Sequence, residues 1–192
     1  MTPGALILAA GSSRRFGGDK RKSEFAPGKT LLQATIELVS ALFNDVLVVL
    51  RADDQDYANE ITVKYPGIVC YCAPESAQGM GHSLGNASTQ ISEWQAAAVF
   101  LADMPFVAPS TIKALTDTYL VHQADQPIVM PTYADQRGHP VIFDRAYFSE
   151  LASLNGDNGA RTVVSAHKEN VILTSVNDPG VLKDIDRPDD FR

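Results

Sequence analysis

Short apolar runs alternate along this chain with segments whose apolar residues recur every three or four positions. In the first half, runs of strand length cover residues 4–10, 46–50, 68–73 and 96–102. Helical spacing fills the intervals at residues 30–43, 57–65 and 83–94. Strands that alternate with helices are typical of repeated strand–helix–strand units. We therefore expect an α/β protein with a three-layer αβα arrangement around a mostly parallel central sheet.

The second half of the chain continues the alternation with less regular segments. A helix is expected to begin at Pro109 and Ser110 and to bury Ile112, Leu115 and Tyr119. The remaining expected elements are strands over residues 127–131, 141–143 and 171–176, a helix over residues 160–168, and an acidic tail over residues 184–190. We expect a single domain over residues 1–192. Ligands of open α/β sheets bind beyond the carboxyl ends of the strands, so functional residues should follow strand ends.

The composition is that of a folded, water-soluble chain. Of its 192 residues, 45% are hydrophobic and 20% are charged, which excludes a disordered or low-complexity protein. The longest apolar run, residues 96–102, is far shorter than the roughly 18 residues of a membrane span. No basic segment precedes the early apolar run at residues 5–10, so we expect no signal peptide. Cys70 and Cys72 are expected to be buried, reduced thiols, which fits a cytoplasmic location.

The net charge of −7 argues against partners that are large polyanions. Sixteen basic and 23 acidic residues should repel nucleic acid and anionic membranes, and we expect neither as a partner. A local exception lies between residues 14 and 22, where Asp19 stands alone among five basic residues, Arg14, Arg15, Lys20, Arg21 and Lys22. A concentrated positive patch of this kind suits a small polyanion.

The loop after the first strand has the composition of a phosphate cradle. Gly11, Gly17 and Gly18 permit backbone angles that turn successive N–H groups toward one anion. Arg15 and Lys20 would neutralise the remaining charge. The segment has neither the GK[ST] ending of a Walker motif nor the GxGxxG dinucleotide fingerprint, which argues against ATPases and NAD-dependent oxidoreductases.

The run from Leu8 to Lys20 resembles the LAAGxSxR(M/F)GxxK signature of nucleotidyltransferases with the molybdopterin nucleotidyltransferase-like fold. The chain is most similar to the molybdenum cofactor cytidylyltransferases and their relatives. Five later motifs support this resemblance: Gly79-Met80-Gly81-His82-Ser83-Leu84, Leu101-Ala102-Asp103-Met104-Pro105, Arg137-Gly138-His139-Pro140-Val141, Gly156-Asp157-Asn158-Gly159-Ala160-Arg161 and Asp184-Ile185-Asp186-Arg187-Pro188-Asp189-Asp190. They occur in the family's order, and the resemblance covers residues 5–190. It implies a Rossmann-like nucleotidyltransferase fold.

The resemblance assigns roles to the residues at the strand ends. Asp103 ends a strand and would hold Mg²⁺, with Asp186 as a second ligand and Asp184 as the alternative. Arg15 and Lys20 would bind the phosphates, although Lys22 is close enough in sequence to replace Lys20. The expected nucleotide-binding residues are Leu8, Ala9, Ala10, Gly11, Ser12, Gly17, Gly79 and Ser83.

The same resemblance implies both substrates. Guanylyl-transferring relatives tend to have glycine where this chain has Ala10, which favours CTP over GTP. Arg137 and His139 lie where such enzymes receive a molybdopterin-type acceptor. Asp157 and Arg161 either contact this acceptor or pair with each other. The implied reaction transfers CMP from CTP to the phosphate of molybdenum-loaded molybdopterin and releases pyrophosphate, and a molybdoenzyme would receive the product.

Other functions remain open from the sequence. Relatives with the same fold transfer GMP, or transfer nucleotides to sugar or alditol phosphates. A nucleotide-binding protein that delivers the cofactor without catalysis is a second alternative. The third is a serine hydrolase, because residues 81–85 satisfy GxSxG around Ser83. That motif requires a sharp turn directly after a buried strand, whereas several polar or small residues separate Ser83 from the strand before it.

Overall fold

A central eight-stranded sheet organises the protein in this computed structural model, which describes residues 2–11 and 16–185. Seven strands follow the order β10-β7-β9-β6-β1-β4-β5, and β8 pairs with the last two residues of β7. Their bounds are β1 (Gly4–Leu8), β4 (Val46–Arg51), β5 (Val69–Ala73), β6 (Ala96–Leu101), β7 (Ile128–Tyr133), β8 (Gln136–Arg137), β9 (Val141–Asp144) and β10 (Val171–Ser175). Strands β5, β4, β1 and β6 are parallel, and β9 runs antiparallel to both of its neighbours.

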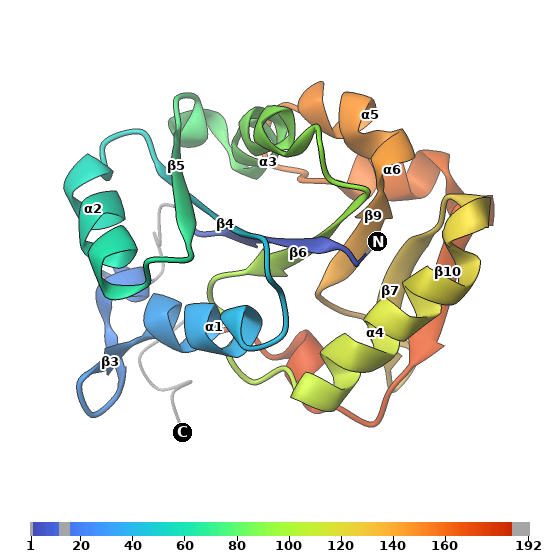
Figure 1. Ribbon diagram of the computed structural model, residues 1–192, viewed down its shortest axis with the longest axis horizontal. Helices are drawn as coiled ribbons and strands as arrows, with labels where there is room; N and C mark the ends of the chain where they lie inside the picture. Colours follow the sequence, from blue (N-terminus) through green and yellow to red (C-terminus); the bar gives the residue numbers. More distant parts are fainter. Residues whose placement is uncertain (1, 12–15, 186–192) are drawn as a thin grey trace.

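Helices cover both faces of this sheet, which confirms the expected three layers. One face carries α1 (Leu31–Ser40), α2 (Gln55–Lys64) and α4 (Pro109–His122). The other carries α3 (Met80–Ser88), α5 (Phe148–Ala152) and α6 (Arg161–Ala166). Figure 1 shows α3, α5 and α6 on one side of the sheet, with α1 and α4 on the opposite side.

Burial on both faces explains why the strands are continuous apolar runs. In β1, Ala5 and Ile7 pack in the core beneath α1 and α4, and Leu6 packs in the core beneath α3 and α5. All three side chains are fully buried. A strand with helices on only one face would instead alternate apolar and polar residues.

Several boundaries differ from the sequence expectations. Helix α1 begins after Thr30, whose side chain accepts a hydrogen bond from the Gln33 amide in a capping box, and it ends at Ser40. The helix expected over residues 83–94 begins earlier, at Met80, and ends at Ser88. Short 3₁₀ helices complete the structure: Lys20–Lys22, Ser76–Gln78, Thr89–Ile91, Gln123–Asp125, Arg145–Tyr147, Lys168–Asn170 and Pro179–Leu182.

The sequence pattern missed the shortest elements. The hairpin of β2 (Glu24–Ala26) and β3 (Lys29–Thr30), the two-residue β8 and the five-residue α5 were not expected. Segments of two to five residues hold too few apolar positions for a period to emerge. The antiparallel direction of β9 is also invisible in the pattern, because its four residues are buried like those of a parallel strand.

Two further expectations concern burial and membranes. Cys70 and Cys72 are free thiols, as expected, but they lie half-buried on the edge strand β5 and not fully within the core. Within residues 2–11 and 16–185, no helix has the length and apolar character needed to cross a membrane.

Candidate active site

A cavity of about 710 Å³ opens where the central parallel strands end. Its walls come from the segments that follow β1, β4, β5 and β6, and from the start of α3. The chain passes from β1 to β4 and β5 on one side and then returns to β6 on the other, so the strand order reverses beside β1. Such a reversal is where open α/β sheets bind ligands.

A lysine and an aspartate from distant parts of the sequence meet at this cavity. Lys20 begins the 3₁₀ helix after the glycine-rich loop, and Asp103 follows the end of β6. The Lys20 Nζ donates to Asp103 Oδ2 at 2.6 Å and to the Ile185 carbonyl at 2.7 Å. Their side chains are only 13% and 21% exposed, so the pair is shielded from water by the surrounding protein.

The second carboxylate oxygen of Asp103 fits a cation. Asp103 Oδ1 is buried and has no hydrogen-bond partner among the described residues. A buried polar atom of this kind is costly unless a ligand satisfies it. Carboxylate oxygens are the ligands that Mg²⁺ prefers, so the donor chemistry of Asp103 suits a hard divalent ion.

The C-terminal segment approaches the same aspartate. The Ile185 amide donates to the Asp103 carbonyl at 3.0 Å. The adjacent residue Asp186, the expected second metal ligand, lies outside the described residues, whereas Asp184 lies within them. The segment is fixed upstream by the buried Asp178 carboxylate, which accepts hydrogen bonds from the Ala108 amide and the Thr111 hydroxyl. No cluster of three metal-ligating side chains occurs in the part of the chain that the structure describes.

Most of the residues expected to bind the nucleotide line the cavity. They are Leu8, Ala9, Ala10, Gly11, Gly79 and Ser83. Gly17 has a left-handed φ of 76° and is not among the lining residues. Ser12 and Arg15 lie outside the described residues.

Glycine allows the start of α3 to approach the segment around Asp157. Gly79 has φ 126° and ψ 173°, a conformation that side chains rarely adopt. A Cβ at this position would lie 2.5 Å from the Gly156 carbonyl oxygen. The Gly81 amide donates to that same oxygen at 2.7 Å. Close backbone packing therefore shapes this wall of the cavity.

The four expected acceptor-binding residues are spread over a wider area. Asp157 lines the cavity, whereas Arg137 on β8 and Arg161 at the start of α6 are exposed and do not line it. His139 is not a lining residue either, and its Nδ1 is buried without a hydrogen-bond partner among the described residues. Burial lowers the pKa of His139, although the Val99 backbone and the charge of Asp103 act in the opposite direction.

The structure corrects part of the expectation of a concentrated positive patch over residues 14–22, of which residues 16–22 are described. The Arg21 side chain is buried and paired with Asp19 and Asp54, so its charge is neutralised within the protein. The Lys22 Nζ lies 4.3 Å from the centroid of the Tyr57 ring and does not line the cavity. Among Lys20 and Lys22, only Lys20 faces the cavity.

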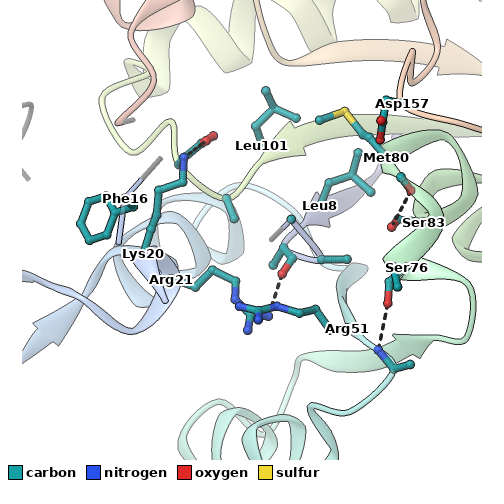
Figure 2. A pocket seen from close by; sticks show the side chains of 18 of the residues that line it. Leu8, Phe16, Lys20, Arg21, Arg51, Ser76, Met80, Ser83, Leu101 and Asp157 are labelled. Carbon is teal, nitrogen blue, oxygen red and sulfur yellow. Dashed lines mark hydrogen bonds and ion pairs between the residues drawn. The ribbon is translucent and has the colours of Figure 1, made fainter. Parts of the chain in front are cut away.

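Some cavity residues were absent from the sequence expectations. Arg51 and Asp53 border the cavity at and just after the end of β4, and Ser76 borders it after β5. The Ser76 hydroxyl accepts a hydrogen bond from the Ala52 amide at 3.0 Å, which joins these two loops. Figure 2 shows Arg51 and Ser76 along one side of the cavity, with Met80, Ser83 and Asp157 grouped together. The expectation that functional residues lie at strand ends could have identified Arg51, because Arg51 is the last residue of β4.

Ser83 does not have the setting of a hydrolase nucleophile. It is 3% exposed and lies inside α3, where its hydroxyl donates to the Gly79 carbonyl at 3.2 Å. The residues between β5 and α3 form a 3₁₀ helix and not a sharp strand-to-helix turn. The GxSxG pattern therefore lacks the geometry that exposes the serine of α/β-hydrolases.

The three-layer fold and the layout of strand ends around the cavity are those of the nucleotidyltransferase class. The chain belongs to the family of the MobA-like NTP transferase domain, whose model matches residues 5–171.

Relatives and solved structures agree with this membership. The chain is 32% identical over 112 residues to a probable molybdenum cofactor guanylyltransferase of Natranaerobius thermophilus, covering 58% of this chain and 52% of the relative. A protein of the same description from Chloroflexus aggregans is 31% identical over 135 residues, which make up 68% of this chain and 60% of that relative. The purine catabolism protein PucB of Bacillus subtilis is 25% identical over 97% of this chain and 92% of its own length. The matches thus span only about half to 60% of the two guanylyltransferases.

The structure of Rv0371c from Mycobacterium tuberculosis H37Rv has a TM-score of 0.76 and 26% identity, covering 100% of this chain and 97% of that one. The same mycobacterial protein has also been solved in complex with manganese, at 25% identity to this chain.

Proposed function

We propose that this protein transfers a nucleoside monophosphate from a nucleoside triphosphate to the phosphate of a molybdopterin-type acceptor and releases pyrophosphate. The observation that carries the proposal is the Lys20–Asp103 pair at the edge of a cavity beside the glycine-rich loop. Membership in the MobA-like family and the names of the two guanylyltransferase relatives support the acceptor class. A molybdoenzyme would then receive the product.

The reaction needs alignment and charge neutralisation but no covalent enzyme intermediate. An acceptor phosphate oxygen forms a bond to the α-phosphorus, and the bond from that phosphorus to the β-phosphate oxygen breaks as pyrophosphate leaves. The Lys20 ammonium would stabilise the increased charge on the phosphates, together with Arg15 and the backbone amides near Gly11. Asp103 and Asp186 would hold Mg²⁺, which supplies positive charge against the triphosphate when it is bound.

We propose CTP as the nucleotide and GTP as the second candidate. The Ala10 side chain lines the cavity and is only 7% exposed, so its methyl group occupies space that glycine would leave free. A smaller pyrimidine tolerates this better than a purine does. GTP is supported by the two relatives that are named as guanylyltransferases.

The acceptor would lie toward the Asp157 side of the cavity. Asp157 is a lining residue beside Met80, which supports its contact with the acceptor. Arg137 on β8, His139 just after it and Arg161 at the start of α6 are further acceptor-binding candidates because they carry charged or polar groups.

A thermal-shift titration with Mg²⁺ and each of CTP, GTP, ATP and UTP tests nucleotide binding without an acceptor. A ligand at 100 times its Kd stabilises the native state by about 2.7 kcal/mol, which corresponds to a Tm rise of roughly 5–10 °C for a domain of this size. We expect the largest Mg²⁺-dependent shift with CTP. A larger shift with GTP would keep the reaction class and correct the base. The absence of a shift with all four nucleotides would contradict the proposed nucleotide site.

A further inference from the structure

Arg21 is a charged side chain beside the cavity whose hydrogen-bonding capacity is fully used within the protein. It is 3% exposed, and its guanidinium donates five hydrogen bonds of 2.5–3.1 Å. Nε and Nη2 bind the two carboxylate oxygens of Asp19, and Nη1 and Nη2 bind those of Asp54. Nη1 also donates to the Ala9 carbonyl at 2.8 Å. A planar guanidinium can serve two carboxylates in this bidentate manner, whereas an ammonium cannot.

The partners of Arg21 stand at the two ends of the glycine-rich loop. Ala9 lies at the beginning of this loop, directly after β1, and Asp19 lies at its end, directly before Lys20. Asp54 belongs to a separate segment, at the start of α2. One guanidinium therefore closes the base of the loop and attaches it to a neighbouring helix. Closing a loop in advance lowers the ordering cost that a ligand must otherwise meet on binding.

The positive charges of Arg21 and Arg51 balance the negative charges of Asp19 and Asp54. Burial raises the pKa values of Asp19 and Asp54, but hydrogen bonds and charge from Arg21 outweigh it, so both pKa values are lowered. Arg51 adds a second cation, with its Nη2 2.9 Å from Asp19 Oδ2. Two carboxylates thus face two guanidinium groups. Arg21 is consequently committed to internal partners and is unsuited to direct contact with a polyphosphate.

We propose that Arg21 is a positioning residue that fixes Lys20 in its place at the cavity. Lys20 follows Asp19 directly and precedes Arg21 in the same 3₁₀ helix. The hydrogen bonds that join Arg21 to Asp19 and Asp54 therefore hold the backbone on both sides of Lys20. This arrangement orients the Lys20 ammonium toward Asp103 and the Ile185 carbonyl. The effect on nucleotide affinity rests on the proposed function, but the effect on the position of Lys20 does not.

Amine acetylation followed by mass spectrometry tests the position of Lys20 without any nucleotide. Lys113, whose side chain is 72% exposed, provides an internal reference in the same sample. In the unaltered protein, Lys20 should react much more slowly than Lys113. In Arg21→Met, we expect the relative labelling rate of Lys20 to rise several-fold. Arg21→Lys should show a similar rise because it keeps the charge but lacks the planar fork, and it provides a second variant if the methionine variant does not fold.

Tyr119→Phe is the matched control for loss of stability alone. It removes a hydroxyl that donates to Asp144 at 2.8 Å, and neither residue lines the cavity. This variant should lower Tm and leave the labelling of Lys20 unchanged. A fall in Tm for Arg21→Met and Arg21→Lys with unchanged Lys20 labelling would overturn the proposal and leave Arg21 a purely structural role.

Nucleotide affinity then separates this inference from the proposed function. Residues of one hydrogen-bond network commonly show coupling free energies that correspond to about a tenfold change in an equilibrium constant. We therefore expect the Kd for the Mg²⁺–nucleotide complex to rise about tenfold in Arg21→Met. The rise should largely disappear in a Lys20→Ala background, because Arg21 acts through Lys20. Increased Lys20 labelling with no change in Kd would support the positioning of Lys20 and contradict its proposed role in phosphate binding.

Discussion

Asp103→Asn should lower kcat for nucleotidyl transfer by about 10²–10³-fold, because one electrostatic group aimed at the reacting centre is typically worth roughly 3–4 kcal/mol and each 1.36 kcal/mol changes a rate tenfold. The substitution keeps the size of the side chain and removes its negative charge. It reduces the ion pair with Lys20 to a hydrogen bond and leaves one neutral oxygen in place of the two charged carboxylate oxygens, of which Oδ1 is buried and has no partner among the described residues. Steady-state kinetics over a range of Mg²⁺ concentrations measures the effect, and we also expect a higher Mg²⁺ requirement.

The fold should survive this substitution. The Asp103 carbonyl keeps its hydrogen bond from the Ile185 amide, and Lys20 keeps its bond to the Ile185 carbonyl. Asp117→Asn is a suitable control, because Asp117 is 56% exposed on α4, where it pairs with Lys113 at 2.7 Å. Loss of this exposed ion pair should change the free energy of unfolding by roughly 0.5 kcal/mol or less and leave kcat unaltered. Activity of Asp103→Asn equal to that of the control would contradict the metal-binding role.

Lys20→Met should reduce kcat/KM by about 10²–10³-fold, since it removes a positive charge that is proposed to stabilise the transferring phosphates. The methionine retains much of the aliphatic stem of lysine. The loss should appear in both KM and kcat, because the ammonium would bind the ground-state triphosphate and stabilise the charge that develops as pyrophosphate leaves. Kinetics with saturating acceptor and varied nucleotide separates the two constants.

Lys22→Met is the matched control for Lys20→Met. It removes the same charge two residues away, where the ammonium lies over the Tyr57 ring and away from the cavity lining. We expect kcat/KM to stay within about twofold of the unaltered protein, as for a surface substitution with a small effect. If Lys22→Met is damaging and Lys20→Met is harmless, the assignment of the phosphate-binding lysine is wrong.

Periodicity and strand ends predicted the main architecture because burial imposes them on the sequence. A strand with helices on both faces must be apolar throughout, and the runs that became β1, β4 and β6 are of this kind. The strand-end rule also singled out Asp103 and the glycine-rich loop, which border the same cavity. Their proximity follows from topology alone, since parallel strands β1 and β6 are neighbours and end at the same edge.

The pairing of Arg21 with Asp54 was beyond prediction from local sequence. Arg21 looked like part of a positive patch because its nearest basic neighbours are adjacent in sequence. Its partner Asp54 is 33 positions away and approaches only when β1 and β4 pair. Likewise, the Lys20 contact with Ile185 joins residues 165 positions apart. Side-chain partners at such separations depend on the register and packing of the folded chain.

Formation of the dinucleotide product tests the central claim most directly. The protein should be incubated with Mg²⁺, molybdenum-loaded molybdopterin and CTP labelled at its α-phosphate, with labelled GTP in a parallel reaction. We predict that the label enters a pterin dinucleotide together with an equivalent amount of pyrophosphate, and that CTP is the better donor. Preferential transfer from GTP would correct the base and preserve the reaction. Nucleotide binding without labelled dinucleotide or pyrophosphate would contradict the claim and identify a non-catalytic nucleotide-binding protein.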